Sequence, residues 1–329
     1  MAAAIALFAG AAMASNFRAA DQVYVPAAGH ASSSSATFIS DVFISNLTDD
    51  SVDVSVIYAT GAVPAAPTNL QQFPKILTLA PRERRELVDF VSNTLHLSSA
   101  LGQLIFNGCK ATTDCTPDAI TGLNSNYRNI SVESRIFSIA LGANASTAPT
   151  NGQLFSGIPW YNFVSESASG AGLDKIFITG VRNTAQFRTN VGFINASQFS
   201  TTTITASLFA GSGTGTTPLQ TANFTLGPLG WVQSSVTSIF SAFPVGPTST
   251  NAYIVFQQSG TSKTSDADAN GCPTGCPAFF AYGSQLDNLT QDATTLEPQY
   301  LMPLTDKAIL CIYSPDVALC AAKAGSGPH

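Results

Sequence analysis

The chain has 329 residues, of which 45% are hydrophobic and only 10% carry a charged side chain, with a formal net charge of -6 at pH 7. This length and hydrophobic content suffice for two cores of ordinary size. The absence of a basic stretch argues against nucleic acid and against acidic substrates as partners. Average soluble proteins have about 25% charged residues, so hydroxyl and amide groups solvate this surface, as suits a secreted or cell-surface protein.

Residues 1–14 are predicted to be a signal peptide. They form an apolar run in which Ala12 and Ala14 are the small residues that signal peptidase requires, so cleavage is expected before Ser15. The run is too short to span a bilayer, and no later segment reaches the roughly 18 apolar residues of a membrane helix. We therefore expect a secreted, extracellular or cell-surface protein without a transmembrane segment in its mature form.

An internal repeat relates the two halves of the chain. The segment Phe38–Asn46 matches Phe187–Asn195, and each copy is followed by an alternating strand, a Leu-x-Pro turn and a further apolar strand. These matched segments are Val52–Tyr58 with Thr203–Phe209, Leu79–Pro81 with Leu226–Pro228, and Gln103–Phe106 with Tyr253–Phe256. Because the repeat is the length of a domain, it indicates a domain duplication rather than a solenoid.

The repeated segments predict the fold class. They are short, rich in Val, Ile, Thr, Phe and Tyr, and separated by Gly, Pro, Asn and Ser, which is typical of antiparallel sheets with one buried face. We predict an all-β protein of two tandem antiparallel β-sandwich domains, immunoglobulin-like or jelly-roll-like, with short helical turns at 87–95 and 232–243. The expected boundaries are 15–148 for the first domain, 149–298 for its duplicate and 299–329 for a C-terminal strand and tail.

Four polar residues recur at equivalent places in the repeat. Asn46 and Asn195 end matched strands, where an amide side chain can bond nearby backbone groups. Asp41 and Asn190 lie inside those strands among apolar neighbours, where a partly buried polar group can tie a strand to a loop. All four are predicted to be structural.

The cysteines predict disulfides. Six cysteines in an exported chain favour oxidised pairs, and their spacing favours three local loops, although fifteen pairings are possible. The close pairs are Cys109 with Cys115, Cys272 with Cys276, and Cys311 with Cys320. The alternative is a zinc site at Cys272 and Cys276, but no second pair of ligands follows nearby to complete it.

The segment at 266–271 contains the best local motif for a cofactor. Asp266, Asp268 and Asn270 place oxygen ligands on alternate residues before a glycine, as at the start of a calcium loop. Pro277 stands where an EF-hand has its bidentate Glu, so an EF-hand is excluded. The open alternatives are a different calcium loop or a polar hairpin tip closed by a disulfide; no other cofactor is expected.

The tail begins with a pattern seen twice before. Tyr300–Pro303 resembles Val23–Pro26 and Ile158–Tyr161, as if a third unit started there. One interpretation is a last strand that pairs back onto the second domain. The other is a strand offered to a neighbouring molecule, since edge strands accept added chains.

The combined pattern resembles a group of uncharacterised secreted proteins of acidobacteria and related environmental bacteria, built from tandem β-sandwich-like units. The residues that carry the resemblance are Phe38–Asn46 with its copy Phe187–Asn195, the Leu-x-Pro turns, Ser134–Phe137 and Tyr282–Thr290. The resemblance covers most of the chain after the signal peptide. It implies the fold and export, and it implies no activity.

No catalytic set is recognisable, so the protein is predicted not to be an enzyme. The chain has three histidines, His30, His96 and His329, and no Gly-x-Ser-x-Gly elbow to pair with them. Trp160, Tyr161 and Trp231 are the candidates for stacking on sugar rings. The competing interpretation is that these aromatic residues fill the cores.

Two functional hypotheses follow. The first is a non-catalytic secreted or cell-surface protein, structural or adhesive, that assembles with itself through its terminal strand or binds cell-surface glycans. The alternative is a carbohydrate-binding module or carbohydrate-active enzyme, for which the three aromatic residues are the evidence.

Overall fold

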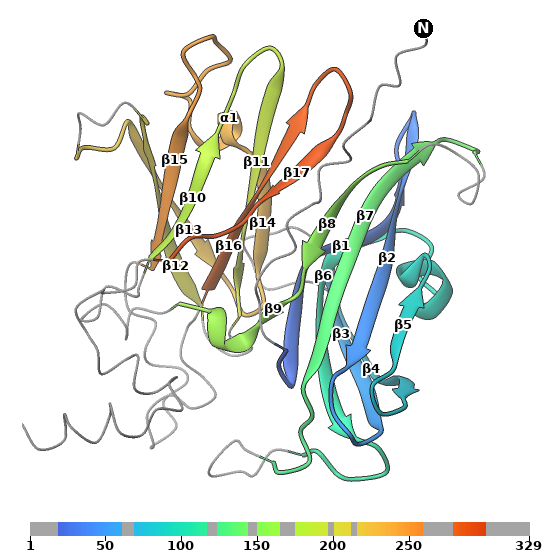
Figure 1. The fold of residues 1–329 in the computed structure, drawn as a ribbon. Helices are drawn as coiled ribbons and strands as arrows, with labels where there is room; N and C mark the ends of the chain where they lie inside the picture. The colour runs from blue at the N-terminus through green and yellow to red at the C-terminus, as the bar shows by residue number, and fades with distance from the viewer. Residues whose placement is uncertain are drawn as a thin grey trace, which may run out of the picture.

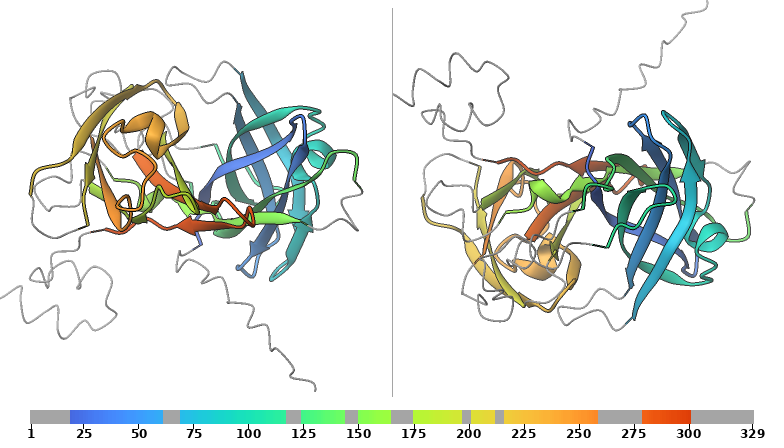
Figure 2. Two further views of the ribbon diagram at one scale, coloured as in Figure 1. Left: turned by 90° about the horizontal axis from the view of Figure 1, so that it is seen from above. Right: turned by 90° about the horizontal axis from the view of Figure 1, so that it is seen from below.

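The computed structural model describes residues 19–60, 69–116, 124–143, 150–164, 175–196, 201–211, 216–258 and 279–300. Antiparallel strands make up most of this part of the chain and form two sandwiches that lie side by side (Figures 1 and 2). The protein is therefore all-β, with tandem sandwich units, as predicted.

The first sandwich is a nine-stranded sheet folded over on itself. Strand β1 belongs to both layers, because its residues 22–30 pair with β6 and its last two residues pair with β2. One layer has the order β4-β3-β6-β1 and the other β5-β2-β7-β8. The strands are β1 (Gln22–Ser32), β2 (Ala36–Asn46), β3 (Val52–Thr60), β4 (Asn69–Leu79), β5 (Arg84–Leu87), β6 (Ala100–Lys110), β7 (Ile130–Ala140), β8 (Asn151–Ser156) and β9 (Ile158–Pro159), with a helical turn η1 (Phe90–Thr94).

The second sandwich repeats this strand order. Its two four-stranded sheets have the orders β10-β15-β12-β13 and β14-β11-β16-β17. The strands are β10 (Lys175–Val181), β11 (Phe187–Asn195), β12 (Thr202–Phe209), β13 (Gln220–Leu226), β14 (Trp231–Ser235), β15 (Ala252–Gln258), β16 (Phe279–Asp287) and β17 (Ala293–Leu296), with a short helix α1 (Val236–Ile239). Matching β1–β8 with β10–β17 in chain order reproduces the strand order of both layers; the pairing of β1 with β2, which joins the layers of the first sandwich, is not repeated between β10 and β11.

The first strands of the two sandwiches also share an irregularity. The register of β1 against β6 shifts between Val25 and Ala28, and that of β10 against β15 shifts between Ile178 and Val181. Because the partner residues Leu104 and Ile254 are equivalent in the strand pairing, both bulges lie at the same place. A bulge bends its strand and increases its twist, so the two units curve in the same way.

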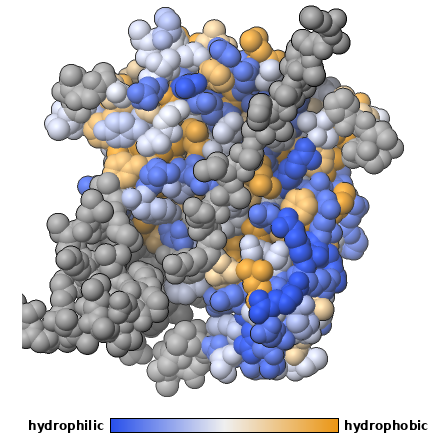
Figure 3. All heavy atoms as spheres, viewed as in Figure 1, coloured by the Kyte–Doolittle hydropathy of each residue, from blue (hydrophilic) through white to orange (hydrophobic). Residues whose placement is uncertain are grey.

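Alternating residues explain why these segments form sandwiches. In β12, Ile204, Ala206 and Leu208 are fully buried, while the residues between them face outward. Since successive side chains of a strand point to opposite faces, this pattern places one face on the core. The outward positions make a surface of mostly hydrophilic residues with hydrophobic ones scattered among them (Figure 3).

The repeated asparagines tie the end of one strand to the Leu-x-Pro turn. Asn46 Nδ2 donates to the carbonyl oxygen of Ala80 at 2.9 Å, and Asn195 Nδ2 donates to that of Gly227 at 2.9 Å. Both side chains are buried. Asp41 also ties a strand to a loop, because its Oδ1 accepts the backbone N–H of Asp89 at 2.9 Å. The two asparagines and Asp41 therefore have the structural roles predicted for them; no corresponding bond is seen for Asn190, which lies on β11 opposite Ser235.

The division between the units differs from the predicted one at 148/149. Strand β8 pairs with β7 of the first sandwich, and β9 pairs with β1, so residues 151–159 complete the first unit. Val164 bridges Phe279 at the start of β16 as Ala20 bridges Ile130 at the start of β7. The second unit therefore begins near Val164, after the turn η2 (Trp160–Asn162).

The predicted entry strands are not equivalent to one another. Val23–Pro26 lies within β1, whereas Ile158–Pro159 pairs with β1 from the other end of the unit. Gln299 occupies the place of Ile158, since its backbone exchanges hydrogen bonds of 2.9 and 2.8 Å with Phe177 of β10. The described start of the tail therefore pairs back onto its own second sandwich; residues 301–329 lie outside the described residues.

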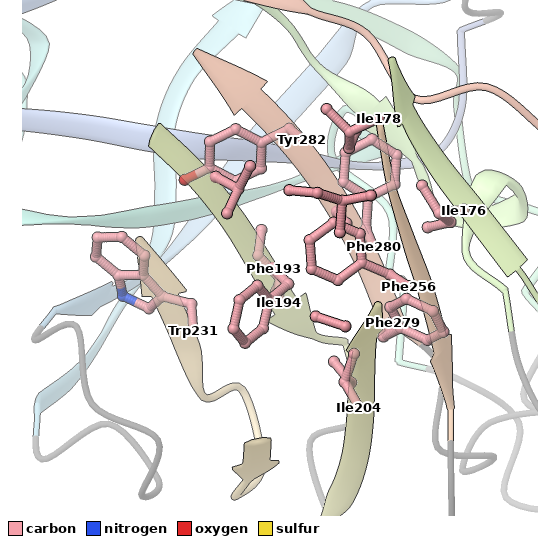
Figure 4. Packing of buried hydrophobic residues seen from close by; sticks show 14 of the residues in the cluster. Ile176, Ile178, Phe193, Ile194, Ile204, Trp231, Phe256, Phe279, Phe280 and Tyr282 are labelled. Carbon is pink, nitrogen blue, oxygen red and sulfur yellow. The ribbon is translucent and has the colours of Figure 1, made fainter. Parts of the chain in front are cut away.

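One hydrophobic cluster joins the two sandwiches. Figure 4 shows part of it in the second sandwich. Most of its members belong to the second unit, but Tyr24, Ile105 and Phe155 of the first unit are part of it. The Phe155 ring meets the Tyr282 ring edge-on with centroids 5.6 Å apart. A second cluster, centred on residues such as Phe90, fills the first sandwich alone.

A disulfide joins Cys109 and Cys115, as predicted, and closes the loop after β6. The other predicted disulfide residues, Cys272, Cys276, Cys311 and Cys320, lie outside the described residues, as does the predicted signal peptide. In the part of the chain that the structure describes, no helix has the length and hydropathy needed to cross a membrane.

Candidate ligand-binding face

The outer face of the first sandwich is covered by the second. Tyr24 on β1 and Ile105 and Gln103 on β6 point away from their own core, yet all three are buried. Gln103 Nε2 donates to the carbonyl oxygen of Leu229 at 2.7 Å, and the Tyr24 ring meets the Phe163 ring edge-on at 4.6 Å. Burial raises the pKa of the Tyr24 phenol, so it stays protonated. This face of the fold is thus a docking surface in the first unit.

The equivalent face of the second sandwich is the outer side of β10-β15-β12-β13. Phe177 faces Val255 across β10 and β15, in the positions of Tyr24 and Ile105. Phe177 and Val255 are only partly buried. We call this surface the outer face of the second sandwich; its described members are Lys175, Phe177, Thr203, Thr205, Ser207, Phe209, Thr221, Asn223, Thr225, Tyr253, Val255 and Gln257.

Two aromatic rings are stacked on this face. Phe209 and Tyr253 are directly paired across β12 and β15, and their rings lie 5.0 Å apart with planes within 5° of parallel. This separation matches the spacing of about 4.8 Å between neighbouring strands. The rings therefore stack along the direction that runs from strand to strand across the sheet. Each ring therefore turns its second side toward the next strand. In the first sandwich the equivalent positions hold Ala59 and Gln103, which carry no rings.

The bulge of β10 lies opposite Tyr253. Gly180 lies in this bulge with φ +74°, a conformation that L side chains rarely adopt, and a Cβ added there would meet nothing within 4 Å. Tyr253 is flanked on β15 by Ala252 and Ile254, which pair with Val181 and Ile178 on either side of the bulge. The residues of β10 opposite Tyr253 are therefore Thr179, which is exposed, and Gly180, which has no side chain.

Hydroxyl and amide groups cover the rest of the face. They pair across β12 and β13: Thr205 Oγ1 donates to Asn223 Oδ1 at 2.8 Å, and the hydroxyls of Ser207 and Thr221 lie 3.4 Å apart. Lys175 is the only charged side chain among the described residues of the face. Ring faces beside neutral donors and acceptors suit a neutral ligand with both C–H and hydroxyl groups.

The aromatic residues predicted to bind sugars do not come together. Trp160 is 52% exposed in the turn between the units, with its Nε1 donating to Asp21 Oδ1 at 2.8 Å. Trp231 is 1% exposed and packs in the shared cluster, so its prediction as a stacking platform is wrong (Figure 4). Its partner in the register is Ile194, a core residue of β11, which turns the indole inward. The side chain of Tyr161 lies outside the described residues.

Phe209 and Tyr253 were missed by sequence reasoning. Both lie in segments predicted as strands, and in both segments the buried residues alternate with them. The alternation of buried and outward residues was therefore the signal that both side chains lie on the outer face. Their pairing could not be seen, because it depends on the register between β12 and β15.

The predicted calcium ligands Asp266, Asp268 and Asn270 lie outside the described residues. Among the residues that are described, no three His, Cys, Asp or Glu side chains are grouped so that they could hold a metal ion. His30, which the strand β1 positions, pairs through Nδ1 with Asp89 Oδ1 at 2.9 Å. Since Asp89 has φ +45° and its N–H is held by Asp41, this pair fixes the turn into η1.

Comparison with known proteins identifies no family for the chain. No family model matches it, and no curated protein matches it. A solved structure, the N-terminal CBM22-1-CBM22-2 tandem domain from Paenibacillus barcinonensis Xyn10C, aligns with 81% of this chain and 79% of its own, at 7% identity and a TM-score of 0.20. A TM-score of 0.20 is too low for this likeness to bear on fold or ligand.

Proposed function

We propose that the protein is a non-catalytic adhesive protein, secreted or held at the cell surface, that binds neutral carbohydrate on the outer face of its second sandwich. The observation that carries the proposal is the stacked pair Phe209 and Tyr253 beside rows of hydroxyl and amide groups. The equivalent face of the first sandwich is already used to hold the second one.

The chemistry of this face fits a sugar. A pyranose ring has apolar C–H patches that pack on aromatic rings, and hydroxyls that need donors and acceptors nearby. Phe209 on β12 and Tyr253 on β15 supply the rings, while Thr205 on β12 and Asn223 on β13 supply polar groups on the same face. The face offers a charged ligand few partners, because Lys175 is the one ionic group among its described residues.

Export is part of the proposal. It is supported by the signal-peptide pattern of residues 1–14, by the low charge content and by the Cys109–Cys115 disulfide, since disulfides persist in oxidising compartments. Strand-mediated self-assembly is not part of it. Gln299 pairs within its own chain, and the position equivalent to Leu229 at the unit interface holds Arg82, ion-paired with Asp49 at 2.8 Å. A charged residue there would not continue the apolar interface to a further copy.

The test is binding of the full chain to a panel of neutral polysaccharides, measured by affinity electrophoresis and then by calorimetry. Phe209→Ala and Tyr253→Ala are each expected to weaken binding about tenfold, since an aromatic contact with its buried area is worth roughly 1.4 kcal/mol or more. Trp160→Ala is the matched control and should leave binding unchanged. No reducing ends should be released from a bound glycan.

Three outcomes would refute the proposal: no binding to any polysaccharide, binding that survives loss of both rings, or binding that is lost with Trp160 instead. Circular dichroism of each variant separates a lost contact from a lost fold. Both substituted rings lie on the outside of the sheet, so the variants are expected to keep the wild-type spectrum.

A further inference from the structure

Exposed hydrophobic side chains gather at one end of the molecule. Ten large hydrophobic residues are exposed in the described part of the chain. Seven of them lie at the end of the molecule where strands β1 and β10 finish and the chain turns into β2 and β11. We call these seven the apolar rim: Phe38, Leu70, Leu101, Leu141, Leu219, Val245 and Leu289. Of the other three, Leu47 and Trp160 lie at the opposite end, and Val88 follows the edge strand β5.

The rim extends over both sandwiches. Strands β8 and β17 lie next to each other, with Gln153 Nε2 donating to Thr295 Oγ1 at 2.9 Å and Thr295 Oγ1 donating to the Leu154 carbonyl at 2.6 Å. The hairpins β7–β8 and β16–β17 therefore rise on the same side of the molecule (Figure 1). Hydrophobic residues appear among hydrophilic ones along this upper edge (Figure 3).

The tip of the hairpin β16–β17 presents an apolar side chain on a fully bonded backbone. Leu289 is 81% exposed. Every backbone N–H from Asp287 to Ala293 donates within the protein, including those of Leu289 and Thr290 to Asp287 Oδ1 at 2.7 and 3.1 Å. These two bonds hold the pKa of Asp287 below its usual range, so the carboxylate that organises the turn stays ionised at neutral pH.

Two other loops of the rim are also held by hydrogen bonds to their backbone. Leu141 is 54% exposed, and its N–H donates to the Ser35 carbonyl at 3.1 Å across the neighbouring hairpin. Val245 is 63% exposed in a loop that Asn183 closes, with the Asn183 Nδ2 donating to Phe243 and its carbonyl accepting from Gly246. These hydrogen bonds hold the two loops in place beside their exposed side chains.

We propose that the apolar rim docks on the surface of a lipid bilayer. At the Leu289 tip the backbone N–H groups are already paired, which is what a water-poor environment demands. The side chains protrude singly from separate loops, which a fluid acyl region can accept one by one, whereas a protein partner would need one continuous complementary surface. The described charges near the hairpin β16–β17 are two of each sign, since Arg182 and Arg188 flank the start of β11 while Asp287 and Asp292 flank the hairpin turn, so the match is to a neutral bilayer.

The test is flotation of the full chain with vesicles of phosphatidylcholine and phosphatidylethanolamine, in 0.15 M and in 1 M salt. Leu141→Asp, Val245→Asp and Leu289→Asp are each expected to reduce the vesicle-bound fraction about tenfold, because each removes an inserted apolar group. Leu47→Asp, an equally simple change at the opposite end, should bind as the wild type does. High salt should have little effect.

A second measurement detects a gain of signal on binding rather than a loss of binding. Leu289→Trp should show blue-shifted fluorescence on adding vesicles, and Leu47→Trp should show none. The proposal is overturned if the wild type fails to float, if Leu47→Asp abolishes flotation as Leu289→Asp does, or if binding needs anionic lipid and disappears in high salt. It is also overturned if the wild type forms a dimer that does not bind vesicles and the rim variants disrupt that dimer. Tyr253→Ala should float normally, which separates this proposal from the glycan site.

Discussion

Replacing Asn195 by alanine is expected to destabilise the protein by about 3 kcal/mol, because it leaves buried backbone carbonyls without a donor. Asn195 is fully buried, and its Nδ2 donates to the carbonyls of Leu226 and Gly227 at 3.2 and 2.9 Å. Asn46→Ala should have a similar effect, since its amide donates to Asp50 and Ala80 and accepts the N–H of Thr48. The hydrogen bonds between the end of the strand and the Leu-x-Pro turn would then stabilise both sandwiches in the same way.

Urea denaturation followed by circular dichroism measures this effect. Asn223→Ala is the matched control, because Asn223 is exposed on β13 and bonds to a surface hydroxyl; its cost should stay within about 0.5 kcal/mol. If Asn195→Ala and Asn46→Ala also cost no more than that, the asparagines do not hold the turns and the account of the repeat is wrong.

Phe155→Ala is expected to cost about 3 to 5 kcal/mol and to lower the stability of both sandwiches together. Phe155 lies on β8 of the first unit, is 3% exposed and packs against Tyr282 of the second. Since the cluster that contains it continues into the core of the second unit, the void should weaken that core as well.

Trp231 reports on the second sandwich, because it is buried there. In a Trp160→Phe background, its fluorescence transition in urea should shift to lower concentration with Phe155→Ala and coincide with the transition by circular dichroism. A Trp231 transition that Phe155→Ala leaves unmoved would show that the two units unfold independently and that the shared cluster does not couple them.

The local pattern of hydrophobic and polar residues was enough to predict the class of fold and the duplicated segments. The segments Phe38–Asn46 and Phe187–Asn195 are the equivalent strands β2 and β11, and both repeated asparagines lie at their ends. The unit boundary was misplaced because nothing local in residues 151–159 says which sheet they join. That choice is made by pairing with β7 and β1, strands that precede them in the chain.

The candidate site depended on still longer-range information. Trp231 looked available for a ligand, but its register opposite Ile194 turns it into the core. Phe209 and Tyr253 looked like ordinary strand residues, and only the pairing of β12 with β15 stacks them. The outer face of the second unit became recognisable as a candidate by comparison with Tyr24 and its buried neighbours in the first.

Hydrogen–deuterium exchange with a bound neutral polysaccharide tests the proposed binding face most directly. The account predicts that added protection concentrates in peptides from β10, β12, β13 and β15, and that it is lost in the Phe209→Ala, Tyr253→Ala double variant. Protection centred instead on the turn at Trp160 or on the first sandwich, with β12 and β15 unchanged, would contradict it.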